Sequence, residues 1–272
     1  FSSDIKEKIA NADMVFISVN SPTKLKGIGA GMACDIKWIE LSARQIAKYS
    51  RGNTIVVEKS TVPVGTAEII KKILKESQEE DNKNNIDQKT FSILSNPEFL
   101  SEGSAINDLC NPDRILIGGD NEESIKALEN IYLNWIEEKK ILRTNLWSSE
   151  LSKLTANAFL AQRISSINSI GAICELSGAN INEVSKAIGM DSRLGSKFLQ
   201  SGPGFGGSCF PKDILNLIYI AKFYGLNEVA SYWSTVIELN NWHKKRISQI
   251  IIQKLFGTIS GKKIAILGFA FK

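Results

Sequence analysis

A glycine-rich segment that ends in a cysteine is the part of the sequence best suited to chemistry. It occupies residues 202–213 and reads GPGFGGSCFPKD. Small residues let the backbone turn tightly and approach a ligand closely. A thiol at the end of such a turn, here Cys209, is a nucleophile when positive charge or amide dipoles favour its thiolate. The alternative is a plain glycine turn beside a buried cysteine that acts as a small hydrophobic residue.

A catalytic histidine is not expected to activate this thiol. His243 is the only histidine in the sequence, and we expect it to be a surface or interface residue. A Cys-His pair would have to use it. Activation is therefore expected from lysines, backbone amides and carboxylates. Lys153 and Asn157 lie four residues apart in a predicted long helix, so they share one of its faces.

Short apolar runs in the first part of the chain predict the elements that would position a site. Runs at 14–19, 54–58, 91–94 and 114–117 are typical of buried parallel strands. Helical patterns at 33–47 and from Pro63 onward lie between them, whereas 76–89 is polar and predicts a surface loop. Strands that alternate with helices predict a doubly wound, Rossmann-like α/β sheet.

Ligands of such sheets bind beyond the carboxyl ends of the strands. The polar segments that come after three of the predicted strands, at 19–23, 59–63 and 95–98, are therefore candidate binding segments. Each is also ordinary turn chemistry when taken alone. Their expected shared location favours a functional role.

The second part of the chain is predicted to be mostly helical. Ser148 or Ser149 is a candidate cap for a long helix, Gly178 a candidate stop, and Asn180 a candidate cap for the next helix. The chain thus has three predicted regions: the α/β region 1–145, an all-helical region 146–257, and the start of another α/β unit at 258–272, whose first strand is expected at 263–267. We expect a fragment of a longer chain, because the sequence begins without methionine and stops just after this strand.

Composition and charge exclude several classes of protein. The net charge is only +4, and acidic residues are mixed with the basic ones, so nucleic-acid binding is not expected. No apolar run approaches the roughly 18 residues of a membrane span, and no signal peptide is recognisable. The cysteines form no Cys-x-x-Cys pair, so no metal site is expected. Free thiols are typical of a reducing, cytoplasmic setting.

Six ordered motifs resemble those of the UDP-glucose/GDP-mannose dehydrogenase family, and within it those of the eukaryotic UDP-glucose 6-dehydrogenases. The resemblance covers essentially the whole chain. The motifs are FISVNSPT at 16–23, EKSTVP at 58–63, SNPEFLSEG at 95–103, LSKLTANAF at 151–159, the cysteine segment, and GFAFK at 268–272.

This resemblance implies a domain organisation, a cofactor and an assembly. Residues 1–145 would be the C-terminal part of an NAD-binding Rossmann domain, 146–257 a central helical dimerisation domain, and 258–272 the start of a nucleotide-sugar-binding domain. The cofactor would be NAD. The chain would form a homodimer through its helical domain and a higher homo-oligomer beyond it. The truncation implies negligible turnover by the chain alone.

The implied reaction is oxidation of the C6 hydroxyl of UDP-glucose to a carboxylate, with two NAD and one water. Cys209 would trap the intermediate aldehyde as a thiohemiacetal, whose oxidation gives a thioester. Lys153 and Asn157 match residues that stabilise negative charge developing on oxygen. Lys153 is also a candidate proton donor and acceptor.

Three further residues match the family's water chemistry. Asp213 matches the carboxylate that positions or deprotonates water. Glu98 matches an acid/base residue that assists thioester hydrolysis, and Thr61 one that holds the water network.

The remaining matches concern binding. Arg193 matches an arginine that reaches the sugar bound in a neighbouring subunit, which would make the site shared across a dimer. The implied cofactor contacts are Val19, Asn20, Ser21, Pro22, Thr23, Ser60, Thr61, Val62, Glu102 and Lys212, and the implied substrate contacts are Glu98, Phe99, Leu100, Glu102, Lys153, Asn157, Arg193, Gln200, Gly204, Phe205, Gly206, Phe271 and Lys272.

Three alternatives stay open. A sister enzyme would oxidise GDP-mannose or a UDP-N-acetylhexosamine by the same cysteine chemistry. A non-catalytic fragment would only dimerise through its long helix. A β-hydroxyacid dehydrogenase would share the architecture and a helical lysine, but it would not need Cys209.

Overall fold

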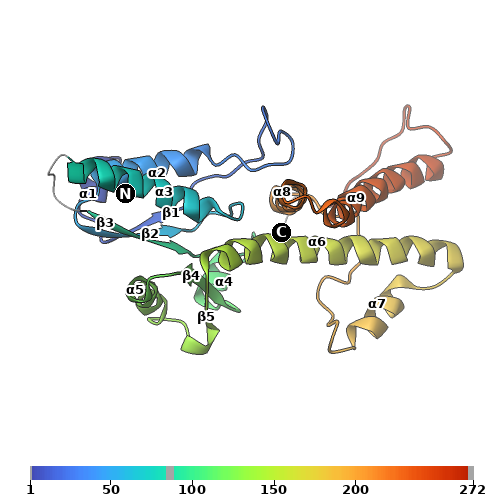
Figure 1. Cartoon of the computed structure of the whole chain (residues 1–272). Helices are drawn as coiled ribbons and strands as arrows, with labels where there is room; N and C mark the ends of the chain where they lie inside the picture. The colour runs from blue at the N-terminus through green and yellow to red at the C-terminus, as the bar shows by residue number, and fades with distance from the viewer. Residues whose placement is uncertain (1, 84–88, 269–272) are drawn as a thin grey trace. The chain divides into compact units, whose positions relative to one another are not determined.

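The computed structural model describes residues 2–83 and 89–268 (Figure 1). The predicted substrate contacts Phe271 and Lys272 lie outside these residues. The chain divides into two compact units, a sheet unit of residues 1–154 and a helical unit of residues 155–272.

The sheet unit is built on five strands in the order β1-β2-β3-β4-β5. The β1, β2 and β3 strands are parallel, β3 and β4 are antiparallel, and β4 and β5 are again parallel. Its elements are α1 (Ile5–Ala10), β1 (Met14–Ile17), α2 (Lys37–Tyr49), β2 (Asn53–Glu58), α3 (Thr66–Lys83), β3 (Thr90–Ser95), α4 (Ala105–Cys110), β4 (Ile115–Gly119), α5 (Glu122–Tyr132), the 3₁₀ turn η1 (Glu138–Lys140) and β5 (Ile141–Thr144).

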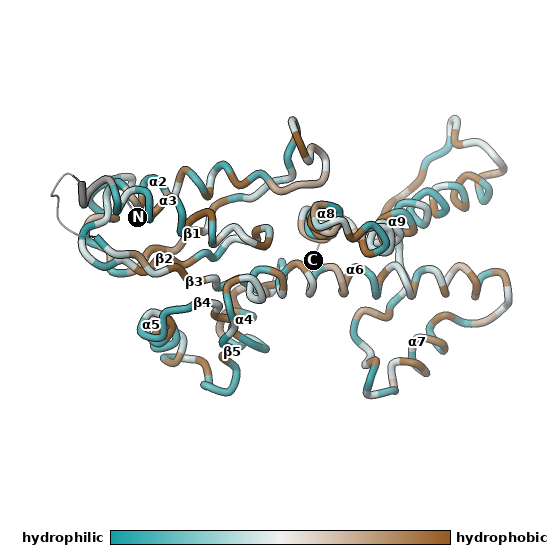
Figure 2. Tube along the Cα trace, viewed as in Figure 1, coloured by the Kyte–Doolittle hydropathy of each residue, from teal (hydrophilic) through white to brown (hydrophobic). Residues whose placement is uncertain are grey.

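Helices cover both faces of this sheet. Successive side chains of a strand point to opposite faces of the sheet, so each strand contributes to two hydrophobic cores. Val56 and Ile93 belong to the core beneath α2 and α3, whereas their neighbours Val57 and Leu94 belong to the core beneath α5. Figure 2 shows the resulting run of hydrophobic residues along β2 and β3. Burial on both faces explains why these strands are continuously apolar rather than alternating.

The predicted α/β sheet is confirmed, with three corrections. All four predicted strands are present, but the β3–β4 pair is antiparallel, so the sheet is not wholly parallel. The β5 strand was not predicted, because ILRT is short and half polar. Residues 76–83, expected in a surface loop, instead belong to α3. Their Lys, Glu and Gln side chains are good helix formers, and helix propensity prevails over the polarity of the segment.

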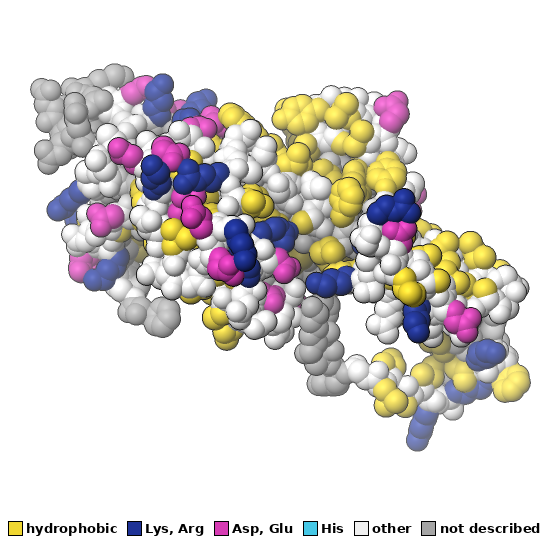
Figure 3. Space-filling model, turned by 90° about the horizontal axis from the view of Figure 1, so that it is seen from below, with side chains coloured by type: hydrophobic (Ala, Val, Ile, Leu, Met, Phe, Trp, Pro, Cys, Tyr) yellow, Lys and Arg dark blue, Asp and Glu magenta, His cyan; other side chains and the backbone are white. Residues whose placement is uncertain are grey.

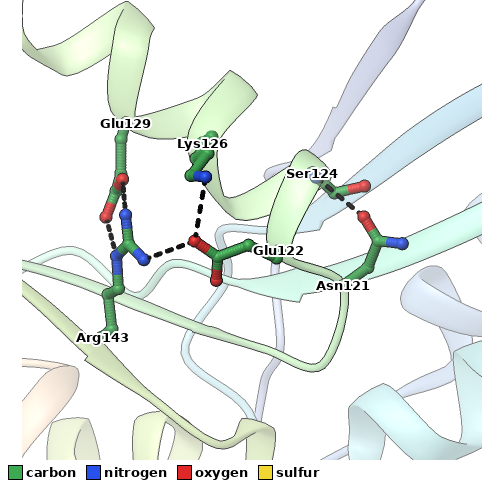
Figure 4. A network of polar contacts seen from close by, with 6 residues as sticks. All are labelled: Asn121, Glu122, Ser124, Lys126, Glu129 and Arg143. Atoms are coloured by element: carbon green, nitrogen blue, oxygen red, sulfur yellow. Dashed lines mark hydrogen bonds and ion pairs between the residues drawn. The ribbon is translucent and has the colours of Figure 1, made fainter.

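An ion-pair network attaches β5 to α5 (Figure 4). The Arg143 guanidinium of β5 donates to both carboxylate oxygens of Glu129, and its other terminal nitrogen lies 2.8 Å from Glu122 Oε1. The Asn121 side chain caps the same helix by accepting from the Ser124 amide at 2.8 Å. A bidentate arginine–carboxylate contact fixes orientation as well as charge. These contacts stabilise β5, which has too few apolar residues to be held in the sheet by their burial alone.

Two buried carboxyl groups meet in the sheet unit. Glu58 ends β2 and is 1% exposed, and Glu150 in the first turns of α6 (Leu146–Ser177) is 2% exposed. The Glu150 carboxylate accepts from the amides of Gly65 at 2.6 Å and Ala67 at 2.7 Å, at the start of α3. Burial, followed by the negative charge of Glu150, raises the pKa of Glu58 well above its ordinary value. Burial also raises the pKa of Glu150.

The helical unit contains most of α6 (Leu146–Ser177), which begins in the sheet unit, together with α7 (Ile181–Gly189), α8 (Cys209–Phe223) and α9 (Asn227–Lys254). Helices α8 and α9 lie side by side (Figure 1). The buried side chains of this unit include Ala161 and Ile167 of α6, Ile214 and Ile218 of α8, and Trp233 of α9.

The predicted ends of the helices are partly correct. The α6 helix ends at Ser177, directly before Gly178, and Asn180 caps α7 by accepting from the Asn182 amide. The predicted cap at Ser148 or Ser149 is wrong, because α6 already begins at Leu146 and Asn145 Oδ1 accepts from the Ser148 amide at 2.7 Å.

The strand expected at 263–267 is absent, because residues 262–268 form no regular element. A strand needs a hydrogen-bonded neighbour, and this segment has none among the described residues. Ile266 and Leu267 are exposed there. No helix in residues 2–83 or 89–268 combines the length and hydropathy needed to span a membrane.

Candidate active site

The polar segments after β1 and β2 meet at one edge of the sheet, as predicted. The Ser21 hydroxyl donates to the Thr61 carbonyl at 2.6 Å, and the Ser60 hydroxyl donates to the Val19 carbonyl at 2.7 Å. These bonds join the segment after β1 to the segment after β2. The predicted cofactor contacts of both loops therefore lie side by side, although Ser21 and Val62 are themselves buried.

Lys59 comes directly after β2 and lies within a buried polar group. Its ammonium is 3.1 Å from Asn96 Oδ1, just after β3, and 3.3 Å from the Tyr132 hydroxyl. Tyr132 also donates to Asn96 Oδ1 at 2.6 Å, and Asn96 is fully buried. Burial lowers the pKa of Lys59 to about 8, the charge of Glu98 opposes this change, and the charge of Lys153 adds to it. Lys59 is thus only partly protonated near pH 8.

Lys59 also lines a hollow of about 150 Å³ that includes the predicted substrate residues Glu98, Phe99 and Leu100. Two cations lie over the Phe99 ring: the Lys153 ammonium at 5.3 Å and the Arg114 guanidinium at 3.7 Å from its centroid. An aromatic face stabilises a cation. This arrangement holds Lys153 in a position where it is 8% exposed. The hollow is lined by charges of both signs, with Lys59 and Arg114 facing it together with Glu98, Asp108 and Asp113.

The altered pKa of Lys59 predicts a specific pH dependence of stability. Between pH 8 and the ordinary value of 10.5, the unfolded chain binds more protons than the folded chain, so stability increases as the pH rises. We expect the free energy of unfolding of the chain, relative to that of Lys59→Met, to increase by about 1–3 kcal/mol from pH 7.5 to pH 10 in urea titrations. The exposed Lys72 gives a matched control, since Lys72→Met should show no such difference. A constant difference for Lys59→Met would contradict the assignment.

Cys209 is the first residue of α8 in the helical unit, and its thiol is exposed. Backbone amides at the start of a helix carry partial positive charge and favour a thiolate. Pro211 is tolerated here because the first turn of a helix does not use that amide. The glycine turn therefore ends where α8 begins, with Cys209 as the first residue of the helix.

Asp213 lies one turn beyond Cys209 and is 2% exposed. The Asn157 amide of α6 donates to its Oδ2 at 2.5 Å, and the Lys212 ammonium lies 4.0 Å from its Oδ1. Residues four apart share a helix face, so the carboxylate lies on the side of α8 that carries the thiol. The helical unit thus brings together four predicted site residues. They are the proposed nucleophile Cys209, the amide donor Asn157, the carboxylate Asp213 and Lys212.

The other predicted site residues lie in less constrained positions. Arg193 is exposed and pairs with Asp191 of its own chain at 2.6 Å. Glu98, Glu102, Gly206 and the exposed Gln200 lie in loops. Phe205 is instead buried, which suits a structural role for its ring. Within the described ranges, no group of three or more His, Cys, Asp or Glu side chains could hold a metal ion.

The structure also reveals contacts that the sequence did not predict. Asn240 and His243 of α9 and Asn168 of α6 hydrogen-bond to the glycine segment before Cys209. The expected surface or interface position of His243 is wrong, because this residue is 4% exposed. Its neighbours in the sequence are Trp242 and Lys244, and only the packing of α9 reveals which face of the helix is covered. The sequence did indicate Lys59 and Asn96 as candidates for a site, because each lies in the polar segment after a predicted strand.

Comparison with known proteins connects these features to a family. Residues 1–136 match the NAD binding domain of the UDP-glucose/GDP-mannose dehydrogenase family, and residues 147–242 match its central domain. The whole chain is 58% identical to UDP-glucose 6-dehydrogenase of Caenorhabditis elegans and 57% identical to UDP-glucose 6-dehydrogenase 3 of Arabidopsis thaliana, covering 56% of each. The chain thus spans about half the length of these curated relatives.

A solved UDP-glucose dehydrogenase from Pyrobaculum islandicum has the same architecture. It superposes with a TM-score of 0.83 at 32% identity, over 94% of this chain and 56% of that one. The matched domains define the class: a protein with an NAD binding domain followed by a helical central domain. Within that class, the chain belongs to the UDP-glucose/GDP-mannose dehydrogenase family.

The loops after β1 and β2 fit the cofactor that this family implies. Residues 19–23 and 60–62 contain no acidic side chain, so they do not repel an anionic dinucleotide. They lie at the carboxyl ends of adjacent parallel strands, where dinucleotides bind in such sheets. The bonds between Ser21 and Thr61 and between Ser60 and Val19 hold the two loops together.

Proposed function

We propose that the whole protein containing this chain oxidises the C6 hydroxyl of UDP-glucose to a carboxylate, with two NAD and one water. The observation that carries the proposal is the thiol of Cys209 at the start of α8, one turn before the buried Asp213. High identity with UDP-glucose 6-dehydrogenases over the whole chain supports the choice of substrate.

NAD, when bound, supplies the hydride acceptor for both oxidations. We assign it to the loops at 19–23 and 60–62, with Glu102 and Lys212 as further contacts. Lys153 and Asn157 donate hydrogen bonds to the C6 oxygen as negative charge develops on it. Donors of this kind, when preorganised, are worth about 2.7–4 kcal/mol each in a water-poor site.

Cys209 keeps the aldehyde bound after the first oxidation. Its sulfur forms a bond to C6 and the carbonyl oxygen takes up a proton, which gives a thiohemiacetal. Loss of a hydride and a proton converts this into a thioester. The C6 carbon is thereby carried through both oxidations without release of a reactive aldehyde.

Water then cleaves the thioester. Its oxygen bonds to C6, the carbon–sulfur bond breaks, and the sulfur leaves as a thiolate. This step regenerates Cys209 for the next turnover. Asp213 positions the water and accepts a proton, while Glu98 assists as an acid/base group and Thr61 holds the water network. One UDP-glucose, two NAD⁺ and one water thus give UDP-glucuronate, two NADH and three protons.

Assembly into a homodimer through the helical unit, and into a larger homo-oligomer, is part of the proposal. Figure 3 shows hydrophobic side chains gathered over the helical unit on the face seen from below. Exposed apolar residues of this unit include Phe159, Ile173, Leu176, Phe223 and Tyr224. Apolar patches of this kind are typical of interaction surfaces. Arg193 would reach the sugar bound in a neighbouring subunit, and the four free thiols support a reducing, cytoplasmic location.

The decisive experiment measures NADH released by the whole protein from a panel of nucleotide sugars. We expect two NADH per UDP-glucose and much slower turnover of GDP-mannose and UDP-N-acetylglucosamine. A preference for either of the other sugars would overturn the substrate, and one NADH per sugar would overturn the two-step chemistry.

A non-catalytic role is tested on the 272-residue chain itself. Light scattering gives its assembly state, and fluorescence titration gives its affinity for NAD. Dimerisation without measurable NAD binding would favour an interaction module for this part of the protein.

A further inference from the structure

The glycine segment before Cys209 is held by buried polar side chains rather than by its own turns. Asn240 of α9, which is 3% exposed, makes both of its hydrogen bonds to one residue, Phe205. The Phe205 amide donates to Asn240 Oδ1 at 2.9 Å, and Asn240 Nδ2 donates to the Phe205 carbonyl at 3.0 Å. This is the pairing that a neighbouring strand would provide. The side chain therefore replaces secondary structure at this point of the loop.

Two more side chains hold the start of the same segment. His243 Nε2 lies 2.8 Å from the Gly202 carbonyl. A carbonyl only accepts, so Nε2 carries the proton, and Nδ1 has no partner among the described residues. From the other side, Asn168 Oδ1 accepts from the Gly202 amide at 2.9 Å and from the Ser201 hydroxyl at 3.1 Å.

Gly204 is shaped to admit Asn240. Its φ is +107°, a conformation that favours glycine, and a Cβ placed there would lie 2.6 Å from Asn240 Oδ1. Its neighbour Phe205 packs its ring edge-on against Phe210, with centroids 6.0 Å apart. Phe210 comes directly after Cys209. The contact therefore continues from Asn240 through Phe205 to the first turn of α8.

We propose that Asn168, Asn240 and His243 are positioning residues that fix the segment 202–205 and, through it, the thiol of Cys209. We call these three side chains the loop clamp. The inference rests on the proposed role of Cys209 as the nucleophile. The glycines permit the tight turn but also leave it flexible, since glycine has the most freedom to lose on ordering. The loop clamp supplies the rigidity that a glycine-rich sequence lacks, and catalysis requires it because misplacement by about 1 Å costs about 100-fold in rate.

Hydrogen exchange in the 272-residue chain tests the physical part of the proposal without reference to activity. Asn240→Leu removes both bonds at similar volume, and we expect exchange of the Phe205 amide to accelerate at least about 10-fold. Gly204→Ala should have the same effect, because its methyl group displaces Asn240. Ser165→Ala is the matched control. It removes a buried bond of 2.9 Å between α6 and Val236 of α9, away from the loop. Unchanged exchange of Phe205 in both loop-clamp variants would overturn the proposal.

Kinetics of the whole protein test the positioning role. Asn240→Leu and His243→Phe should lower kcat about 10–100-fold, with a smaller change in KM for UDP-glucose and none in KM for NAD, because the loop clamp places the thiol and touches the predicted substrate contacts only through the backbone. His243→Gln should restore most of kcat, since its amide nitrogen can donate to the Gly202 carbonyl. Ser165→Ala should retain the kcat of the parent. If kcat falls equally in His243→Phe and His243→Gln, or if KM changes instead, the positioning role is wrong.

The two experiments separate this inference from the proposed function. If the Phe205 amide exchanges faster in Asn240→Leu and Gly204→Ala but the whole protein oxidises no nucleotide sugar, the loop clamp is supported and the proposed function is rejected. Two NADH per UDP-glucose with parental kcat in Asn240→Leu would retain the function and reject the positioning role.

Discussion

Replacing Cys209 by serine in the whole protein is expected to lower the rate of UDP-glucuronate formation at least about 10³-fold. A serine hydroxyl stays protonated and is a much weaker nucleophile than a thiol at the start of a helix. Binding should survive, since oxygen replaces sulfur at an exposed position. The variant should therefore bind UDP-glucose with an affinity close to that of the parent, as measured by calorimetry, and yet fail to complete the second oxidation.

Cys110 provides the matched control for this experiment. It is the other exposed thiol, and Cys110→Ser should behave like the parent. A complementary variant, Glu98→Gln, should slow hydrolysis, so that intact mass spectrometry detects the sugar bound to Cys209 as a thioester. Full activity in Cys209→Ser would reject the covalent mechanism and favour hydroxyacid-type chemistry, which needs no thiol.

Replacing Glu150 by alanine is expected to destabilise the sheet unit by about 2–5 kcal/mol. The substitution leaves the amides of Gly65 and Ala67 without the carboxylate that accepts from both of them. Bonds to a charged acceptor are worth about 1.5–3 kcal/mol each, and relief of the repulsion with Glu58 offsets part of the loss. Urea unfolding of the chain at pH 8 measures the effect.

Two variants show whether this effect is specific. Glu68 lies in the first turn of α3 on the surface, so Glu68→Ala should cost less than about 1 kcal/mol. Glu58→Gln should be neutral or stabilising at pH 8, because it removes a carboxyl group whose charge is unfavourable there. If Glu150→Ala and Glu68→Ala cost the same, then the carboxylate of Glu150 does not anchor α3.

The pH dependence of this pair is set by the raised pKa of Glu58. At pH values above the ordinary 4.5, the folded protein retains a proton that the unfolded chain has lost. The stability linked to this proton is complete below pH 4.5 and is lost as the pH rises through the folded-state pKa. In Glu58→Gln this contribution is absent, so the decline in stability above pH 4.5 should be smaller than in the parent.

The fold of the sheet unit was largely predictable because its signals are local. Four buried strands appear as short apolar runs, and burial on both faces makes such runs continuous. The β5 strand escaped prediction because it depends on a partner strand and on the contacts of Arg143 with α5. These contacts join residues 14 or more positions apart, so no window of local sequence contains them.

The candidate site was predictable to a different extent. Cys209 is identifiable because a thiol at the end of a glycine-rich turn carries chemistry. Asp213 and Asn157 were expected from the family resemblance, and the structure places Asn157 against Asp213. Asn240 and His243 carry no such signal. Their importance comes from their contact with a loop 35 or more positions away, which only the packing of α9 creates.

The position of Cys209 as the first residue of α8 bears on how this segment tolerates insertions and deletions. Each residue added to a helix rotates the rest of that helix by about 100° and advances it by about 1.5 Å. An insertion between Cys209 and Asp213 would turn the carboxylate away from Asn157, whatever residue were inserted. Homologous enzymes with this chemistry should therefore vary in residue type here more readily than in length. Variation in length belongs on the far side of Phe223, where α8 has ended.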